Sequence, residues 1–487
     1  MSHYVIAIGG SGSRSLESLV YMCAAGLGPK RVKIVCVDPD RSNGNLKRTL
    51  QLVSLYRSIA EIASAESGPF SSTIDVLEPS VWSPFSQDGG SPTLENYFAY
   101  QAFKVGEPHV AALFDLLYPP EQKKAKLDIG FRGKPSIGAG IFATKVSLRH
   151  EEPWHTLRTN IENDTGSGQK VSLFAVGSIF GGTGAAGLPT IPQLIVEDLT
   201  SGQERIAVGA ALLLPYFTFN PSKDLPEGEV YAHSETFLLN AKEALRYYES
   251  NNRKYNRLYL IGVDQPAVHQ RFSVGGDTQE NPPHIVDFLS GLAALDFMSN
   301  GASDQAQVLM TARRETASYT WEDVPGQDLV RPAVRRLARF CFAFLRLFYP
   351  TLKKIAQGDK AAKRAPWHVG LLQCQGALVS DPKVSKALEQ LNDFCRLYLT
   401  WLGQLSRDTG SDGAFNVRLA DCAAFPNPGD PRSFREDRFA TMMLEPDLNS
   451  CSLNEVWGRA CDLSGQRAPS GAALLSHFVQ SLHRSCE

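Results

Sequence analysis

The chain has 487 residues, of which 43% are hydrophobic and 21% are charged, and its formal net charge is −2. This length and composition predict a folded protein with one large core or two moderate ones, and they exclude a disordered chain. The balanced charge gives no reason to expect a general polyanion binder such as a nonspecific DNA protein.

Neither export nor membrane insertion is indicated by the sequence. No uninterrupted apolar run approaches the ~20 residues that span a bilayer, and no basic stretch with an apolar one behind it follows Met1. The nine cysteines are scattered and form no Cys-x-x-Cys pair, which argues against a zinc or redox centre. We therefore expect reduced thiols and a cytoplasmic protein.

The first half of the chain alternates apolar runs with amphipathic segments. The run Tyr4–Ile8 predicts a strand, Leu16 to Cys23 predict a helix, and Val32–Val37 predict a second, parallel strand. Three later runs, each nearly all apolar, are typical of strands covered on both faces: 171–176, 206–214 and 258–263. These elements predict an α/β fold with a doubly wound parallel sheet.

Other segments indicate where the domains divide. Residues 65–95 are rich in Ser, Pro and Gly and predict a long surface excursion, whereas 282–298 predict a long buried helix. We place the domain junction near residue 300, with domains at 1–300 and 301–487. The second is expected to be α+β, with an amphipathic basic and aromatic helix over 331–358, a strand over 369–374 and a helix over 383–405.

Two glycine-rich segments follow predicted strands. Gly9-Gly10-Ser11-Gly12-Ser13 follows the first strand, and Phe180–Gly187, which contains Gly181, Gly182, Thr183 and Gly184, lies between the strand 171–176 and a helix predicted over 188–199. Glycines let backbone N–H groups approach a phosphate chain, and a helix start adds its dipole. The hydroxyls of Thr183, and of Ser11 or Ser13, would add further contacts.

Acidic residues follow the second strand, where ligands of open α/β sheets bind. Asp38 and Asp40 could hold magnesium through water or contact a ribose. Both could equally be turn formers beside Pro39.

The order of these segments resembles the tubulin/FtsZ superfamily of GTPases. The resemblance rests on Gly9–Gly12, Asp38-Pro39-Asp40, the loop 130–138 and Gly181-Gly182-Thr183-Gly184, and it covers about the first 300 residues. It implies a divergent prokaryotic tubulin-like protein that binds GTP or GDP with Mg²⁺. It also implies that the predicted helix at 282–298 is the central helix, which joins a GTPase domain to an activation domain.

The resemblance assigns roles to further residues. Arg132, Gly133 and Lys134 occupy the place of the γ-phosphate loop, where a cation would favour a triphosphate. Pro215 lies where a ribose is contacted, and Asn281 with His284 would face the base. The asparagine that contacts guanine in the family is not evident after the strand 258–263.

In this family, hydrolysis requires an acidic loop of the next subunit. The local counterpart is Tyr319-Thr-Trp-Glu-Asp-Val, which lacks the usual Asn-x-Asp opening, so Glu322 and Asp323 would take the catalytic role. The resemblance thus implies head-to-tail self-association with coupled GTP hydrolysis.

Other interpretations of these residues stay open. One is a nucleotide-gated scaffold that hydrolyses poorly and holds a partner protein through its second half. Another is an NAD-binding Rossmann-type enzyme, because Asp38 follows the first glycine loop at about the distance of a ribose-binding acid. Arg132, Lys134, Glu322 and Asp323 could also be solvated loop charges, and His284 a helix-start residue. No clear nucleic-acid or membrane signal is present.

Overall fold

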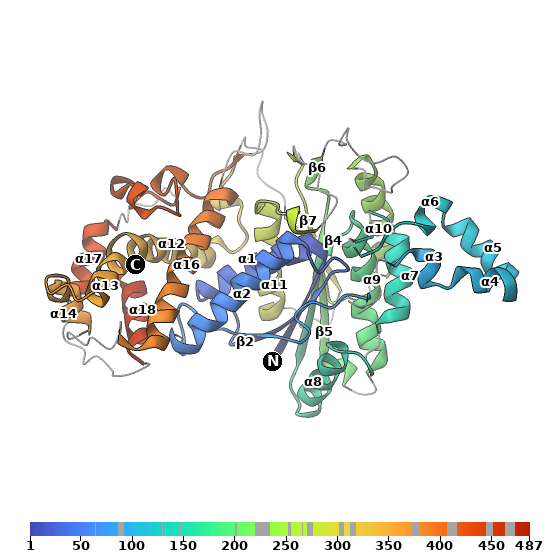
Figure 1. Ribbon diagram of the computed structural model, residues 1–487, viewed down its shortest axis with the longest axis horizontal. Coiled ribbons are helices and arrows are strands. Elements are labelled where there is room, and N and C mark those ends of the chain that lie inside the picture. The colour runs from blue at the N-terminus through green and yellow to red at the C-terminus, as the bar shows by residue number, and fades with distance from the viewer. Residues whose placement is uncertain are drawn as a thin grey trace.

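We describe the protein from a computed structural model (Figure 1). The described residues are 1–63, 65–85, 92–128, 130–131, 133–146, 149–199, 202–219, 234–251, 255–264, 266–269, 276–300, 306–311, 318–372, 380–406, 416–444, 451–462 and 473–487.

A seven-stranded sheet in the order β3-β2-β1-β4-β5-β7-β9 forms the centre of the first half, and every neighbouring pair is parallel. The predicted doubly wound fold is therefore confirmed. The prediction of a surface excursion over 65–95 is wrong at β3, a short strand that pairs with β2 at the edge of the sheet. The strands are β1 (Ser2–Ile8), β2 (Arg31–Val37), β3 (Thr73–Val76), β4 (Val171–Ser178), β5 (Ile206–Leu213), β7 (Arg257–Ile261) and β9 (Gln307–Met310).

The strand order changes direction between β1 and β4. β1 pairs with β2 on one side and with β4 on the other. The helices that follow these two strands, α1 (Gly9–Ala24) and α9 (Gly182–Asp198), lie on opposite sides of the sheet in Figure 1. In open α/β sheets, the crevice at such a switch point, beyond the carboxyl ends of the strands, is where ligands bind.

Both glycine segments are helix starts rather than free loops. α9 begins at Gly182, six residues before the predicted Leu188, and α1 begins at Gly9, directly after β1. The glycines are needed for packing: a Cβ on Gly12 would lie 2.6 Å from the carbonyl oxygen of Val176, and one on Gly184 would lie 2.8 Å from the backbone nitrogen of Ser178. Close contact between helix and strand therefore outweighs the low helix propensity of glycine.

The predicted central helix is α11 (Ile285–Asn300), which packs on α1 and on β5 and β7. A group of short helices, α3 to α6, extends away from the body of the molecule beside α7 (Figure 1). Among the described helices, none has the length and apolar character needed to cross a membrane. The other helices of the first half are α2 (Gly44–Ala63), α3 (Leu94–Tyr97), α4 (Tyr100–Gly106), α5 (Pro108–Leu117), α6 (Pro120–Lys123), α7 (Pro135–Lys145), α8 (Trp154–Gly166) and α10 (Phe237–Asn251).

The described part of the second half is mostly helical, and its helices pack on the first half through α1 and α2. Tyr21 of α1 contacts Phe394 and Trp401, at centroid distances of 5.8 and 4.8 Å. The prediction of a strand over 369–374 is wrong for residues 369–372, because these residues belong to the helix α14. The helices are α12 (Gln327–Ala343), α13 (Tyr349–Ala356), α14 (Pro366–Leu372), α16 (Pro382–Leu405), α17 (Leu453–Asp462) and α18 (Ala473–Ser485).

Two small sheets complete the fold, β6 (Phe217–Phe219) with β8 (Ala267–His269), and β10 (Ser318–Tyr319) with β11 (Asn416–Val417). β9 follows α11 and belongs to the central sheet although it lies beyond residue 300. The division at residue 300 stays a prediction.

Candidate functional site

An open cavity lies at the carboxyl ends of β1, β2 and β4, at the switch point of the sheet. Its empty space, counted with the part that is open to solvent, is about 1000 Å³. The structure brings together at this cavity most of the residues predicted to bind a nucleotide: Gly10, Ser11, Asp38, Asp40, Gly133, Gly181, Gly182, Thr183, Gly184 and Asn281.

The amino ends of α1 and α9 meet at this cavity. Neither helix has a side-chain cap at its first turn, so the first backbone N–H groups of both helices remain for a ligand. Gly9 has a φ of +73°, which a residue with a side chain adopts only with strain. Among the residues that the structure describes, a Cβ on Gly181 would meet only the Ser178 hydroxyl within 4 Å, at 3.0 Å. The backbone there faces the open cavity, as phosphate binding requires.

Two of the predicted residues in the first segment lie behind the cavity wall. Gly12 packs against β4, and Ser13 is buried, with its hydroxyl donating to the Gly9 carbonyl at 3.2 Å. Ser11 is the hydroxyl of this segment that lines the cavity.

Asp38 and Asp40 differ in how much of their carboxylate is available. One oxygen of Asp38 accepts from the backbone N–H of Asp40 at 3.0 Å, and burial raises the pKa of Asp38 to about 8. Both oxygens of Asp40 already accept: one from the N–H and hydroxyl of Ser42, the other from the N–H of Gly276 at 2.6 Å.

Mg²⁺ prefers oxygen ligands, completed by phosphates and water. Asp38 fits such a site through its second oxygen, whereas Asp40 holds the loop in place. Within the described ranges, no cluster of three or more His, Cys, Asp or Glu side chains could hold a metal by itself. Magnesium at Asp38 and Asp40 stays a prediction.

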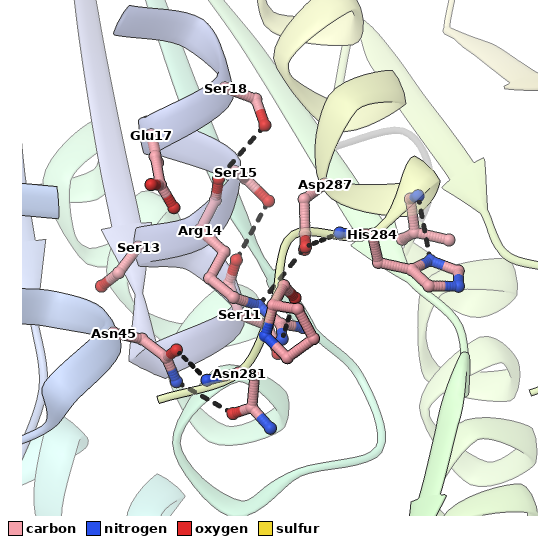
Figure 2. A network of polar contacts seen from close by, with 12 residues as sticks. Ser11, Ser13, Arg14, Ser15, Glu17, Ser18, Asn45, Asn281, His284 and Asp287 are labelled. Carbon is pink, nitrogen blue, oxygen red and sulfur yellow. Dashed lines mark hydrogen bonds and ion pairs between the residues drawn. The ribbon is translucent and has the colours of Figure 1, made fainter. Parts of the chain in front are cut away.

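Paired amides form another wall of the cavity (Figure 2). The backbone N–H of Asn281 donates to Oδ1 of Asn45 at 2.8 Å, and Nδ2 of Asn45 donates back to Oδ1 of Asn281 at 3.1 Å. In the same way, Nδ2 of Asn43 donates to Oε1 of Gln279 at 2.9 Å. The segment before α11 is thereby joined to the start of α2.

A buried ionic network lies beneath this wall. Nε of Arg14 is 3.4 Å from the carboxylate of Asp287, and the guanidinium also donates to the Tyr216 hydroxyl and to the Pro282 carbonyl. The Arg14 and Asp287 side chains are 2% and 0% exposed. Arg14 lines the cavity and connects α1 to the first turn of the central helix.

Sequence reasoning missed Arg14, although one signal was available. Arg14 follows the glycine segment directly and belongs to a helix in which 14 of 16 residues are buried. A charge in such a helix needs a buried partner or a ligand. The same helix carries Glu17, which is paired with Arg48 in a two-pronged contact at 2.9 and 3.1 Å.

Aromatic side chains that were not predicted complete the cavity: Phe180, Phe217, Phe219 and Phe237. Their rings contact one another, for example Phe180 and Phe237 at a centroid distance of 4.8 Å. The predicted ribose contact Pro215 lies just before them and is not part of the lining. His284 packs its ring on Tyr216 at 5.0 Å, and its Nδ1 accepts from the N–H of Val286. It lies behind the wall.

The remaining predicted residues lie away from the lining or outside the described residues. Arg132 belongs to the latter group, and Lys134 precedes α7 without lining the cavity. Glu322 is exposed, whereas one oxygen of Asp323 accepts from the N–H and hydroxyl of Thr320, at 2.8 and 3.2 Å. Asp323 thus caps a short helical turn.

A parallel sheet with two uncapped, glycine-bearing helix starts at its switch point defines an α/β nucleotide-binding domain. No family model and no curated protein matches the sequence. Among solved structures, the fold is similar to CetZ2 from Haloferax volcanii, a tubulin/FtsZ-family protein solved as a GTPγS-bound protofilament. The two share 12% identity with a TM-score of 0.28, over 61% of this chain and 59% of that chain. A similarity at this level assigns no family, residue role or activity to this chain.

Proposed function

We propose that this protein binds GTP or GDP, with Mg²⁺, between the amino ends of α1 and α9. We further propose that it is a tubulin-like GTPase whose hydrolysis is coupled to head-to-tail self-association. The observation that carries the binding is the convergence of two uncapped, glycine-bearing helix starts on one cavity. A single helix start holds one phosphate well, whereas two can surround a chain of phosphates.

Hydrolysis would depend on a carboxylate from a second subunit. Glu322 and Asp323 do not line the cavity of their own chain, and Glu322 is exposed. Both facts agree with a role at a neighbouring subunit's nucleotide. Because Glu322 is exposed, it is the one of the two that a neighbouring subunit reaches more readily, and we propose it to polarise the attacking water.

The capping contact of Asp323 favours a second candidate, a scaffold that binds GTP but hydrolyses it slowly and holds a partner protein through its second half. An NAD-binding enzyme is a third, because the order of the first six strands is also that of dinucleotide-binding folds, in which an acid at the end of the second strand binds a ribose. Asp38 occupies that place.

The test is to denature the purified protein and identify the nucleotide that it releases. We expect GTP or GDP. Release of NAD would replace the proposal with the dinucleotide enzyme. If the protein carries nothing and calorimetry shows no binding of GTP, GDP or NAD in magnesium, the cavity does not bind nucleotides.

A further inference from the structure

The strand β9 lies at one edge of the central sheet and is exposed on both of its faces. It pairs with β7 on one side, and no described strand pairs with it on the other. Successive side chains of a strand point to opposite faces of the sheet. Val308 and Met310 on one face are 54% and 74% exposed, and Leu309 on the other face is 37% exposed. An apolar strand is therefore uncovered at this end of the sheet.

The backbone groups of β9 divide between its two sides. Along a parallel strand, the N–H and C=O of one residue face one neighbouring strand, and those of the next residue face the other way. The N–H of Gln307 donates to the Asn256 carbonyl at 3.0 Å, on the β7 side. The N–H and C=O groups of Val308 and Met310 therefore point away from β7, where they have no hydrogen-bond partner among the described residues.

Most proteins protect such an edge, because its free N–H and C=O groups pair readily with other strands. Charged side chains, prolines and bulges are the usual protection. The opposite edge of this sheet is protected: β3 carries Asp75, which forms an ion pair with Arg31, and its Ile74 is buried. The β9 sequence Gln-Val-Leu-Met has neither a charge nor a proline. The two edges thus differ, and β9 is the one suited to pairing.

A second copy of β9 fits this edge in an antiparallel arrangement. In such a pair, opposite residues alternate between those that exchange both N–H···O bonds and those that exchange none. If Leu309 lies opposite the second copy's Leu309, then Val308 lies opposite the second copy's Met310. These are the residues whose backbone groups point outward, so both Val308–Met310 pairs exchange their hydrogen bonds.

The same register also matches the side chains. Leu309 meets its counterpart at the two-fold axis, in a pair without hydrogen bonds, where opposite side chains are closest. Residues 306–311 carry no charge, so the register places no like charges opposite each other. A strand paired with its own copy covers the edge of both molecules at once, and the assembly therefore stops at a dimer.

We propose that β9 is a self-association surface, at which two copies of this chain pair antiparallel about a two-fold axis and join their sheets into one. The contact uses none of the described residues that line the nucleotide cavity. It needs no nucleotide and is separate from the proposed head-to-tail assembly. Because each strand contributes only 4 residues, the dimer is reversible.

Sedimentation equilibrium of the full-length protein without nucleotide measures this contact. We expect the average mass to rise with protein concentration from the chain mass of 53.3 kDa towards twice that value, and to stop there. A single chain mass up to the highest soluble concentration would overturn the proposal. Continued growth beyond a dimer would overturn it as well, since a two-fold contact closes.

Two substitutions should weaken the dimer for different reasons. Val308→Pro removes an N–H that faces away from β7, so the sheet of the chain itself keeps its hydrogen bonds. Leu309→Lys places like charges opposite each other at the axis. We expect each to weaken the dimer about tenfold or more. Leu116→Lys, at an apolar side chain 81% exposed on α5, is the matched control and should dimerise normally. Normal dimerisation of both β9 variants would overturn the proposal.

Cysteines introduced into β9 test the register. Two Leu309→Cys side chains would lie opposite each other with Cα atoms about 4.5 Å apart, which a disulfide can span. Two Gln307→Cys side chains would point to the same face but lie about 14 Å apart. We expect mild oxidation with diamide to link Leu309→Cys into a dimer, and to link neither Gln307→Cys nor the original protein. Equal yields from the two variants would overturn the two-fold pairing.

Hydrogen exchange distinguishes a second copy from a segment of the same chain at this edge. The amides of Val308 and Met310 should become more protected as protein concentration rises through the range in which the dimer forms. Protection that is the same at every concentration would show that another part of the same chain covers the edge, and the proposal would be overturned.

Discussion

Arg14 is a buried charge whose effect on the free energy of unfolding depends on the presence of its partner, Asp287. Its ion pair with Asp287 is removed from water at both ends. Pairs of this kind add little over an apolar pair of the same shape, yet removing one partner leaves an uncompensated buried charge.

We expect Arg14→Met to lower the free energy of unfolding by about 3–5 kcal/mol, and the double variant with Asp287→Leu to recover most of that loss. Urea denaturation followed by circular dichroism measures both. Arg432→Met is the control, since Arg432 pairs with Asp430 at the surface, where screening by solvent leaves such pairs little effect on stability. Equal losses in the two single variants would contradict a buried, coupled pair.

Asp38 gives the protein a pH dependence of known sign. Burial raises its pKa from 3.8 to about 8, so the folded protein keeps this proton up to about pH 8 while the unfolded chain loses it near pH 3.8. The unfolding free energy should fall as pH rises between these values, by at most about 1.4 kcal/mol per pH unit, and level off above them.

Asp38→Asn should remove this slope. The measurement is urea unfolding of both proteins, without divalent cations, at several pH values between about 5 and 8. Asp437→Asn, at a surface ion pair with Arg435, should keep the slope of the original protein. Parallel curves for the original protein and Asp38→Asn would show that Asp38 is ionised in the folded state.

At the scale of elements, α9 shows that glycines in one motif serve different purposes. Gly181 faces the open cavity, whereas Gly184 is pressed against the end of β4. If the proposed function holds, the first is required by the ligand, whereas the second is required by packing of the helix on the strand.

Substitution by alanine should separate these purposes. Gly181→Ala should fold normally, because its φ of −84° suits any residue, and should weaken GTP binding about tenfold or more by obstructing a phosphate. Gly184→Ala should lower the melting temperature, because the Cβ collides with backbone at Ser178. Thermal melts and GTP calorimetry distinguish the two, and a reversal of these phenotypes would assign the roles the other way round.

The two acidic residues of the turn after β10, Glu322 and Asp323, should differ in function. Asp323→Asn should cost about 1 kcal/mol of stability through its cap, whereas Glu322→Gln should leave GTP affinity unchanged and slow turnover at least tenfold. Thermal melts measure stability, calorimetry measures GTP affinity, and steady-state phosphate release measures turnover. Turnover at the original rate in Glu322→Gln would place the catalytic acid elsewhere.

At the scale of the whole molecule, helix α1 contributes both to the cavity and to the contact with the second half. α1 carries the glycine segment at its amino end and Tyr21, which contacts Phe394 and Trp401 of α16, near its carboxyl end. Arg14 connects the same helix to α11. Helix α1 therefore contacts the cavity, the central helix and the second half of the chain.

The proposed coupling of hydrolysis to assembly also belongs to this scale, because a head-to-tail assembly would share each active site between two chains. Specific GTPase activity should rise steeply with protein concentration. A mixture of Glu322→Gln with Gly182→Val, a variant expected not to bind GTP, should be more active than either alone, because one supplies the bound nucleotide and the other the carboxylate. A flat concentration dependence and an inactive mixture would contradict active-site sharing.

The sequence by itself determined the parallel sheet, both glycine segments and the central helix, because apolar runs and glycines are local signals of burial and close approach. It did not reveal β9, whose four residues are all exposed and carry no burial pattern. The sequence also placed the start of α9 too late. Glycine has a low helix propensity, and its place in this helix is explained only by the close packing of Gly184 on the end of β4.

Only the tertiary structure decided which side chains meet at the cavity. Asn45 and Asn281 are 236 positions apart, and nothing local in either segment specifies their pairing. The same holds for Arg14 with Asp287, and for the raised pKa of Asp38, which depends on burial by the whole fold. Local patterns thus indicated where a phosphate chain would bind, while long-range packing determined which side chains lie around that place.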